Sequence, residues 1–502
     1  MGRTTIPAPL GGVNFQSGIA NVQMPEAVQL DNWIARPACV ESRGGTIVRN
    51  QGEMNNFPIR TLAPHPNGWM VIGTEDKLYP YDTNTNTLSL FTSGFTESRW
   101  NFTLFNDLVI LCNGADTPQA YPGAFTFTPL VITGVTSSTL WGCQTFKGRV
   151  YYWQRDKQEF WYAAAGAYQG ALSRYDLSAF TIKDGYLLAL VPLTIDGGAG
   201  PDDLAAFVFS TGEVLLFQGD DPGSATAWQQ IGRFYIPNPI GPQSWLITGS
   251  ASIVGTVIGA VDLARALAVG PYDVSAVIGQ QVTGTAVNAL PTPIVHSQML
   301  VVPNDNIIWW ARYAEDSFNS GSDIQTLAMD LTAKRWSRFT NLTELAGMGT
   351  TCVGVCNGRL FLGDDLGDLH EYSLTDTGDS VATDGGPIRT QFTTVQAYTD
   401  FGAPTNRKKI TAVSPVTECD AAATGTTAIT FGFNEDYVPN TTNLTNTINI
   451  PDASGVHSEN FSRVCANGFR LGLTWSITAP AGGTGRYRWI ATDVILKTGG
   501  EQ

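Results

Sequence analysis

Charged residues are scarce in this chain of 502 residues, of which only 15% are Asp, Glu, Lys or Arg. Long runs rich in Ala, Glu, Lys and Leu are also missing, so few amphipathic helices are expected. Turn-forming residues, including 53 glycines, instead separate short apolar runs. This pattern predicts an all-β chain. The length allows about two to four average domains, or one large β architecture with appendages.

Basic residues are outnumbered: 29 Lys and Arg stand against 44 Asp and Glu, for a formal net charge of −15. A protein that reads nucleic-acid sequence needs a basic stripe that neutralises phosphates. The charge balance therefore argues against such a binder and is compatible with a surface that repels DNA. An acidic balance is equally the ordinary state of a soluble protein.

Cysteine pairs at metal-binding or redox spacing are absent, because the seven Cys residues are scattered and include no Cys-x-x-Cys. This set predicts folding in a reducing cytosol, with Cys352 and Cys356 as buried thiols on one face of a strand. The N-terminus lacks the basic start and apolar core of a signal peptide. The best membrane candidate, residues 247–269, is interrupted by Asp262 and Arg265, so we expect no membrane span.

No motif for metal binding or nucleophilic catalysis stands out. The histidines are far apart in the sequence, which argues against zinc. Residues 82–86 alternate oxygen-bearing side chains but lack the Gly and Glu of a calcium loop, so a β-turn is the simpler interpretation. Nucleophile elbows and phosphate-binding loops are missing. We therefore predict no catalytic residue, no metal site and no cofactor.

Two features keep carbohydrate chemistry open. Adjacent carboxylates such as Asp202–Asp203 and Asp220–Asp221 are the residue type that glycosidases use, although in turns they are ordinarily just solvated. Tryptophans are plentiful and could stack on sugars or bases. Their alternative role is to fill the wide gaps between wedge-shaped β-sheets.

A repeated unit organises the middle of the chain: a turn with Gly, Asn or Asp, followed by a strand rich in apolar residues. Such hairpins at intervals of tens of residues suggest a β-propeller, with a stack of β-sandwiches as the alternative. Residues 60–386 have room for roughly six to eight blades. Examples of the unit are residues 73–79, 105–111, 146–152, 210–216, 302–308 and 356–362.

The composition changes on both sides of this region and once within it. Residues 241–293 are predicted as a small mixed excursion from a blade, with a helix over 261–268 and a second short one over 272–288. Residues 387–502, rich in Thr and Asn, are predicted as a C-terminal β-sandwich or platform domain. Residues 1–59 are predicted as an N-terminal arm with platform strands.

Residues 11–45 form the most distinctive segment. It combines a Gly-rich polar start with a compact block around one Trp, and it closes in residues 41–45. We interpret it as an extended arm with an aromatic anchor, ending in a turn that leads into the first β-hairpin. The residues predicted to act in docking and register are Leu30, Asp31, Asn32, Trp33, Arg43 and Gly44.

This segment resembles the opening of the tail nozzle, or tail-hub, β-propeller proteins of short-tailed bacteriophages. Later segments resemble the same family in the order its members show, notably residues 200–222, 330–339 and 386–402. Together they cover most of residues 11–416. The last eighty or so residues resemble nothing specific.

The resemblance implies a structural virion protein and not an enzyme. It implies a homohexameric ring below the portal and adaptor that extends the DNA-exit channel and retains and releases the genome. The implied partners are further copies of the chain, adaptor and portal-proximal tail proteins, tail fibres or spikes, and double-stranded DNA that passes without sequence-specific binding. A transient contact with the host cell envelope is a further expectation.

Within such a ring the N-terminal arm would be the strap between subunits or onto the adaptor. The implied location is the virion tail, after assembly in the host bacterial cytoplasm. Two other classes stay open: a propeller tail protein that binds a carbohydrate or host receptor, and a glycan-cleaving enzyme.

Overall fold

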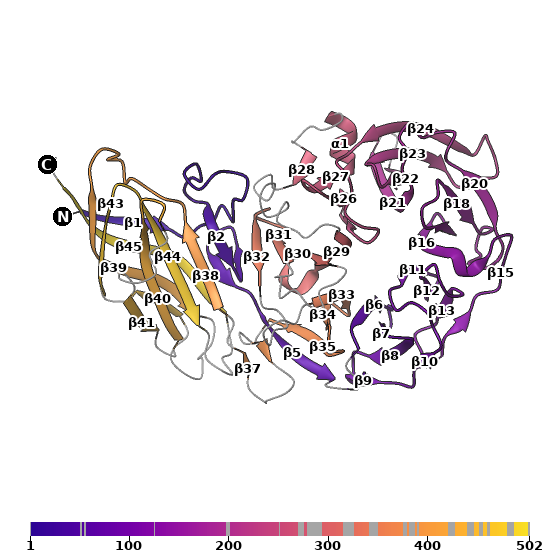
Figure 1. The fold of residues 1–502 in the computed structure, drawn as a ribbon, viewed down its shortest axis with the longest axis horizontal. Coiled ribbons are helices and arrows are strands. Elements are labelled where there is room, and N and C mark those ends of the chain that lie inside the picture. Colours follow the sequence, from indigo (N-terminus) through magenta and orange to yellow (C-terminus); the bar gives the residue numbers. More distant parts are fainter. Residues whose placement is uncertain are drawn as a thin grey trace.

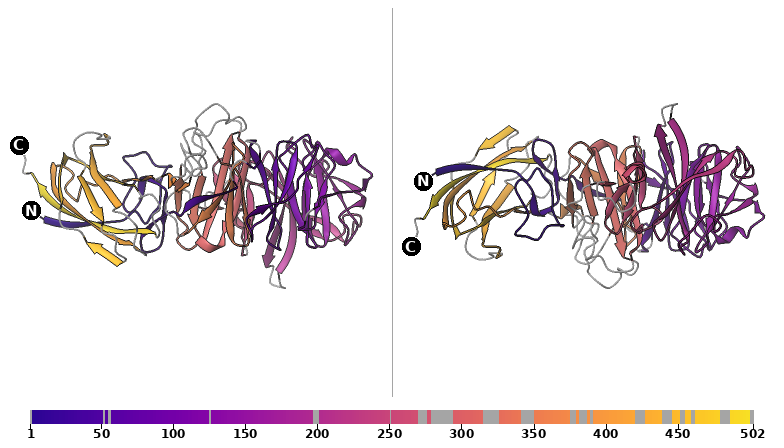
Figure 2. Two further views of the ribbon diagram at one scale, coloured as in Figure 1. Left: turned by 90° about the horizontal axis from the view of Figure 1, so that it is seen from below. Right: turned by 90° about the horizontal axis from the view of Figure 1, so that it is seen from above.

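Two β-rich parts lie next to each other along the long axis of the molecule, a ring of sheets and a β-sandwich (Figure 1). Figure 2 shows them in line, with both chain termini at the far end of the sandwich. The computed structural model describes residues 2–50, 53–54, 57–124, 126–196, 201–249, 251–269, 276–278, 294–314, 326–340, 350–374, 379–380, 387–388, 391–419, 427–438, 446–450, 455–458, 462–478 and 486–499.

The ring is a β-propeller, which confirms the predicted fold class and excludes a stack of sandwiches. The described residues form seven antiparallel blades. The first strands of successive blades lie together toward the centre of the ring. The first four blades are β6 (Ile59–Pro64), β7 (Trp69–Thr74), β8 (Lys77–Asp82), β9 (Thr87–Leu88) and β10 (Thr92–Ser93); β11 (Asn101–Phe105), β12 (Leu108–Cys112), β13 (Gln119–Tyr121) and β14 (Thr128–Pro129); β16 (Leu140–Phe146), β17 (Arg149–Gln154), β18 (Glu159–Tyr162) and β20 (Ser173–Asp176); and β21 (Leu187–Asp196), β22 (Pro201–Phe209), β23 (Glu213–Gly219) and β24 (Trp228–Tyr235).

The last three blades complete the ring. Two short strand pairs lie outside the blade sheets: β15 (Ile132–Thr133) pairs in parallel with β19 (Gly170–Ala171), and β36 (Asp379–Ser380) pairs antiparallel with β37 (Pro387–Ile388). The blades are β25 (Trp245–Thr248), β26 (Ala251–Thr256), β27 (Gly259–Asp262) and β28 (Val277–Ile278), with helix α1 (Leu263–Val269); β29 (Ile294–Val302), β30 (Ile307–Ala314), β31 (Thr326–Asp330) and β32 (Trp336–Phe339); and β33 (Thr350–Cys356), β34 (Arg359–Asp364), β35 (Leu369–Ser373) and β5 (Gly45–Asn50).

The N-terminal part of the chain closes the propeller. Strand β5 pairs antiparallel with β35 and is the outer strand of the seventh blade. The expectation that this segment leads into a first hairpin is therefore wrong. The partner of β5 lies more than 300 residues later, so no local sequence pattern could reveal the pairing.

The excursion predicted over residues 241–293 is also wrong for the part of this range that the structure describes, because β25 to β28 form a four-stranded fifth blade. Its strands are rich in small residues for a steric reason. A Cβ on Gly255 would overlap the Ser244 hydroxyl and lie 3.0 Å from the Trp310 ring of the next blade. The helix predicted over 261–268 corresponds to α1. Within the second predicted helix, Val277 and Ile278 form strand β28 instead, and apart from Ala276 its remaining residues lie outside the described part of the chain.

Large aromatic residues fill the wedge between the third and fourth blades. Phe160 stacks on Phe207 with ring centroids 4.9 Å apart, and Phe217 stacks on Trp228 at 5.4 Å. All four side chains are buried. This packing supports the gap-filling role of the aromatics over sugar stacking at these positions.

The sandwich is built from both ends of the chain, so residues 1–59 do not form a free arm. One of its sheets has seven strands, and the other continues from the sixth blade. The first contains β1 (Gly2–Pro7), β3 (Trp33–Ala35), β4 (Val40–Ser42), β39 (Lys408–Cys419), β42 (Gly455–Ser458), β43 (Ser462–Gly468) and β45 (Tyr487–Thr498); the second contains β2 (Ala27–Asp31), β38 (Gln391–Gln396), β40 (Thr427–Glu435), β41 (Asn446–Ile450) and β44 (Leu471–Thr478).

An aromatic core joins the two sheets of the sandwich. Trp475 of β44 stacks on Trp489 of β45 with ring centroids 4.2 Å apart. Trp33 of β3 packs against Phe392 of β38 at 5.2 Å. Burial of these rings, contributed by segments from both ends of the chain, explains why the N-terminal residues fold back onto the C-terminal strands.

Candidate functional site

The six residues predicted for docking lie where the sandwich meets the propeller. Leu30 and Asp31 end strand β2, Trp33 begins β3, and Arg43 and Gly44 connect β4 to β5. Every one of the six, Asn32 included, is buried within the chain. The predicted strap onto another subunit or an adaptor is therefore corrected: these side chains contact their own chain, because their partners are the sixth and seventh blades and the sandwich core.

Strand β2 makes the sandwich and the propeller share one sheet. It pairs in parallel with β32, the outer strand of the sixth blade, and antiparallel with β38 of the sandwich. The result is a nine-stranded sheet that runs from β29 to β41. At the parallel crossing, Arg338 donates from Nε to Asp31 Oδ1 at 2.6 Å and from Nη2 to Oδ2 at 2.7 Å.

Asn32 turns the chain from β2 into β3. Its backbone has φ of 65°, a left-handed conformation that Asn tolerates better than most residues. Its Oδ1 accepts hydrogen bonds from Arg43 Nε and from the Thr340 backbone N–H, both at 2.9 Å. Asn32 thus binds the end of β32 to the segment that leads into β5.

Arg43 and Gly44 fit the junction by different means. The Arg43 guanidinium is fully buried and donates to backbone carbonyls of Gly44, at 2.7 Å, and Thr340, at 3.3 Å. Gly44 donates its N–H to the Tyr372 hydroxyl at 2.9 Å. A Cβ at Gly44 would overlap the carbonyl oxygen of Ser373, so only glycine fits there.

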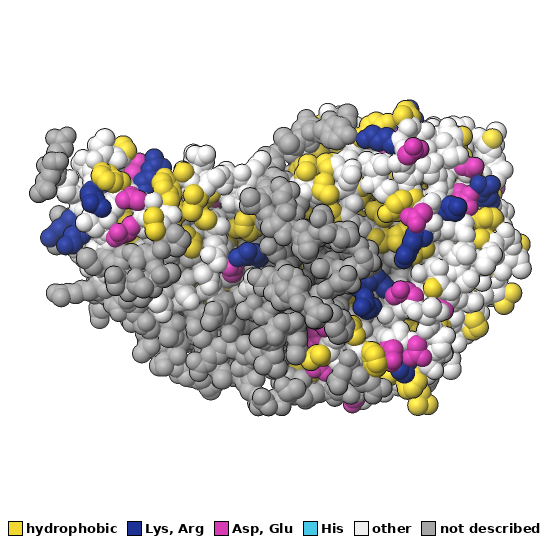
Figure 3. All heavy atoms as spheres, in the orientation of Figure 1, with side chains coloured by type: hydrophobic (Ala, Val, Ile, Leu, Met, Phe, Trp, Pro, Cys, Tyr) yellow, Lys and Arg dark blue, Asp and Glu magenta, His cyan; other side chains and the backbone are white. Residues whose placement is uncertain are grey.

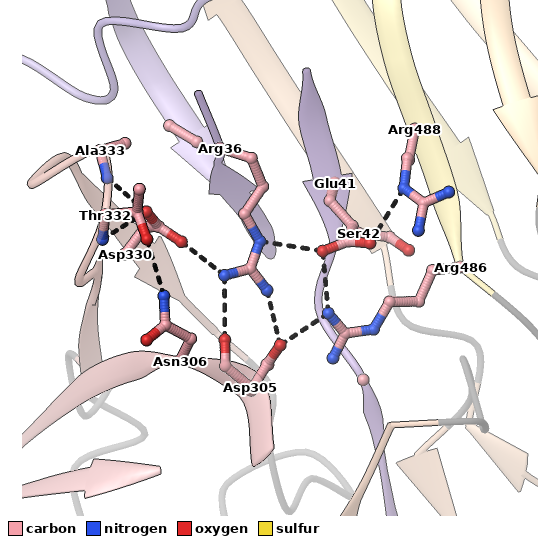
Figure 4. A network of polar contacts seen from close by, with 12 residues as sticks. Arg36, Glu41, Ser42, Asp305, Asn306, Asp330, Thr332, Ala333, Arg486 and Arg488 are labelled. Carbon is pink, nitrogen blue, oxygen red and sulfur yellow. Dashed lines mark hydrogen bonds and ion pairs between the residues drawn. The ribbon is translucent and has the colours of Figure 1, made fainter. Parts of the chain in front are cut away.

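Arg36 organises a buried ion network beside these residues (Figure 4). Its guanidinium contacts Asp305 Oδ1 at 2.6 Å, Asp330 Oδ2 at 2.6 Å and Glu41 Oε2 at 2.9 Å. Burial of Arg36 acts to lower its pKa, but Asp305, Asp330 and Glu41 outweigh it and raise the pKa above its usual value. Arg36 therefore stays charged, and it joins the turn between β3 and β4 to the sixth blade.

Arg486 and Arg488 bring the C-terminal segment into the same network. Arg486 Nη1 contacts Asp305 Oδ1 at 2.7 Å and Glu41 Oε2 at 3.0 Å, and Arg488 Nε contacts Glu41 Oε1 at 3.2 Å. The buried Tyr372 hydroxyl donates to Asp305 Oδ2 at 2.9 Å. Because Asp305 and Glu41 are each shared by several donors, the network fixes the position of the sandwich against the propeller. Sequence analysis missed it, since its members come from four separate parts of the chain, residues 36–41, 305–330, 372 and 486–488, and form no motif.

A second candidate site is a cavity lined mainly by the first strands of several blades. A cavity of about 560 Å³ is lined mostly by apolar side chains of β11, β16, β29 and β33 and by the segment before β25. A smaller cavity of about 130 Å³ adjoins it, lined by Arg60, Glu97, Arg99, Trp141 and Arg155 among others. Shared lining residues of the two are Asn101, Pro242, Gln243 and Gln298.

Nothing in the described part of the chain forms a metal cluster: no three His, Cys, Asp or Glu side chains gather in a way that could hold an ion. Asp82, in the segment that resembled a calcium loop, instead caps a turn by accepting the Asn84 N–H at 2.8 Å and the Thr85 hydroxyl at 3.0 Å. Cys352 and Cys356 are buried free thiols of one strand, β33. Among the described helices, none has the length and apolar character needed to cross a membrane.

Comparison with known proteins finds structures of similar backbone fold whose sequences have low identity to this chain. No family model matches the sequence, and no curated protein matches it. A streptogramin B lyase structure covers 66% of this chain and 98% of its own, with 12% identity and a TM-score of 0.41. The structure of U3-55K covers 66% and 98%, with 9% identity and a TM-score of 0.41. The Cps50 (Swd1) β-propeller domain of Myceliophteria thermophila covers 66% and 100%, with 10% identity and a TM-score of 0.40. The propeller assignment itself rests on the sheet topology above.

Proposed function

We propose that this protein is a structural virion protein, a tail nozzle or hub subunit of a short-tailed bacteriophage. In this proposal six copies assemble below the portal and adaptor and surround the DNA-exit channel, which retains and then releases the genome. Its partners are further copies of itself, adaptor and portal-proximal proteins and tail fibres or spikes, and its location is the virion tail. The collinear sequence segments in residues 11–416 support this family.

The observation that carries the proposal is the rigid connection of two domains. A shared sheet crosses at Asp31 and Arg338, and the buried network around Asp305 ties the propeller to both ends of the chain. A subunit that must hold a channel open under DNA pressure needs such a fixed relation between its parts.

The charge of the chain also suits a DNA conduit. With a net charge of −15 per copy, a ring of six copies would carry a large excess of negative charge, which disfavours association with DNA. DNA could slide past such a ring without binding, since affinity for phosphates needs Lys and Arg. The proposed contact with DNA is therefore passage without sequence recognition.

The two alternative classes have less support among the described residues. A sugar-binding propeller stacks its ligand on accessible aromatic rings, and four of the propeller tryptophans, Trp228, Trp309, Trp310 and Trp336, are buried and cannot serve in this way. A glycan-cleaving enzyme would need two carboxylates facing one cleft. Asp203 instead accepts a hydrogen bond from Thr194 of the neighbouring strand at 2.8 Å, as an exposed cross-strand pair does.

Mass photometry of the purified full chain, alone and mixed with the portal–adaptor complex, tests this function. The proposal expects the mass of the portal–adaptor complex to rise in the mixture by six times the 53.9 kDa of this chain. In an assay for released sugars, the proposal expects neither sample to hydrolyse host-envelope glycans. A chain that stays monomeric with the portal–adaptor complex, or that cleaves glycans with turnover, would contradict it.

A further inference from the structure

Arginine side chains gather in one small cavity of an otherwise acidic protein. Arg60 of β6, Arg99 and Arg155 line the 130 Å³ cavity, and Glu97 is the single carboxylate among the lining residues that the structure describes. The Glu97 carboxylate accepts the backbone N–H of Arg99 at 3.0 Å. In Figure 3, Lys and Arg side chains lie toward the middle of the propeller face with Asp and Glu side chains beside them, whereas the lining of this cavity holds three arginines and one glutamate. The cavity therefore has a local excess of positive charge.

Two of these arginines have no acidic partner within the described part of the chain. Neither Arg60 nor Arg155 forms an ion pair there, whereas Arg36, Arg338 and Arg359 all do. The Arg155 guanidinium lies 5.3 Å from the ring centroid of Trp141, which also lines the cavity. Guanidinium groups present several N–H donors and pair readily with carboxylates and phosphates. Arg60 and Arg155 are thus available for an anion.

The wall shared with the larger cavity is held in place by a chain of amides. Gln243 Nε2 donates to the Trp100 carbonyl at 3.1 Å, and Gln298 Nε2 donates to Gln243 Oε1 at 2.8 Å. Gln298 Oε1 in turn accepts the Val353 N–H at 2.9 Å. This chain links the second blade to the sixth and seventh. The site is therefore formed before any ligand arrives, which lowers the entropy cost of binding.

The larger cavity is suited to an apolar group. Phe102, Trp153, Trp245 and Met299 are among its lining residues. Its volume of about 560 Å³ lies within the range of roughly 300–1,000 Å³ that small-molecule sites occupy. The smaller cavity, at about 130 Å³, has space for one charged group and a few waters of about 30 Å³ each.

We propose that the centre of the propeller binds an amphipathic anion. Its carboxylate or phosphate would lie between Arg60 and Arg155, and its aromatic or aliphatic body would occupy the larger cavity. Two sources share this chemistry: a free small molecule, or the C-terminal carboxylate of a polypeptide chain with apolar side chains. The proposal is independent of the nozzle function, which requires no ligand in the propeller.

Calorimetric titration of the full chain at low ionic strength tests the site. The probes are 2-naphthoate, its neutral counterpart 2-naphthamide, and the peptide acetyl-Gly-Leu-Phe with a free or an amidated C-terminus. The site predicts that naphthoate binds at least about tenfold more tightly than naphthamide, as expected when a charge-assisted hydrogen bond is lost. A free-acid peptide that binds more tightly than naphthoate indicates the polypeptide source, and the reverse order indicates the small molecule.

Variants make the test specific. R60Q/R155Q is expected to weaken naphthoate binding at least about tenfold. R155Q alone should also weaken it. Because Arg155 is exposed, this single substitution leaves the core intact. R265Q, an exposed arginine on α1, is the matched control and should bind as the unaltered chain does. Absence of naphthoate binding, equal binding of naphthamide, or unchanged binding by a folded R155Q variant would overturn the proposal.

Discussion

Asp31 and Arg338 face each other in parallel register across the boundary between the sandwich and the propeller, joined by two hydrogen bonds of 2.6 and 2.7 Å. Both carboxylate oxygens of Asp31 accept a hydrogen bond, and each comes from a different nitrogen of the Arg338 guanidinium. The pair therefore fixes orientation as well as distance, which a single ion contact would not do.

Loss of this pair should weaken the junction. The side chains are 9% and 24% exposed, so solvent screens the pair only in part. We expect D31A and R338A each to lower the free energy of unfolding by about 1–3 kcal/mol. In a double-mutant cycle by urea denaturation, the two effects should be strongly non-additive. Additive effects would show that the pair does not couple the domains.

Gly44 allows the chain to approach the end of β35 closely, just before β5 pairs with that strand. Because a Cβ there would overlap the Ser373 carbonyl, G44A should lower the free energy of unfolding by about 3 kcal/mol or more. The matched control is G18A, since a Cβ at Gly18 meets nothing within 4 Å. Its effect should stay within about 0.5 kcal/mol in thermal or chemical denaturation. Equal stability of G44A and G18A would disprove the close approach.

Asp305 is the more buried of the two carboxylates that each serve three donors in the ion network, the other being Glu41. Its side chain is 2% exposed and serves Arg36, Arg486 and Tyr372. D305A leaves the guanidinium groups of Arg36 and Arg486 with fewer partners, so it should lower the free energy of unfolding by about 3–5 kcal/mol. The control D176A removes a carboxylate that is 50% exposed and should change little. Similar denaturation midpoints for the two variants would contradict the role given to the network.

Glu371 makes closure of the propeller sensitive to acid. It lies between Arg359 of β34 and Arg49 of β5, the strand that completes the seventh blade. Burial of Glu371 acts to raise its pKa, but hydrogen bonds from Arg359 and Arg49 outweigh it and hold the pKa below its usual value. A lowered folded-state pKa gives stability that is complete above the unfolded value of about 4.3 and disappears as the pH falls through the folded value.

The melting temperature, followed from pH 7 down to pH 3, checks this effect. E371Q should be less stable than the unaltered chain at pH 7 and should lose less stability on acidification. The control E53Q alters an exposed glutamate and should keep the pH profile of the unaltered chain. An E371Q profile with an unchanged slope would exclude Glu371 as a source of the acid sensitivity.

Local features of the fold could be predicted from the sequence, and distant pairings could not. Two-residue turns such as Asn106–Asp107 and Asn357–Gly358 adopt positive φ at both positions, as their residue types indicate. Strand β1, by contrast, pairs with β45 about 490 residues away. Pairing of that kind depends on tertiary packing, which leaves no mark in nearby residues. The N-terminal segment therefore looked like a free arm.

The candidate site could also be predicted only in part, because its local segment is visible in the sequence and its distant partners are not. Residues Leu30 to Trp33 and Arg43 to Gly44 do come together, because a short chain segment joins them. Their partners Thr340, Tyr372 and Asp305 lie on blades far along the chain, and sequence offers no signal for such contacts. The cavity between Arg60 and Arg155 is likewise assembled from separate blades.

Electron microscopy of the full chain bound to its portal–adaptor complex is the most direct test of the central claim, that this protein is a rigid subunit of a tail nozzle. The account predicts a sixfold ring around a DNA-sized channel, with sandwich and propeller in the same relative placement in every subunit. Isolated monomers beside an unoccupied portal–adaptor complex, or subunits whose two parts adopt variable placements, would contradict it.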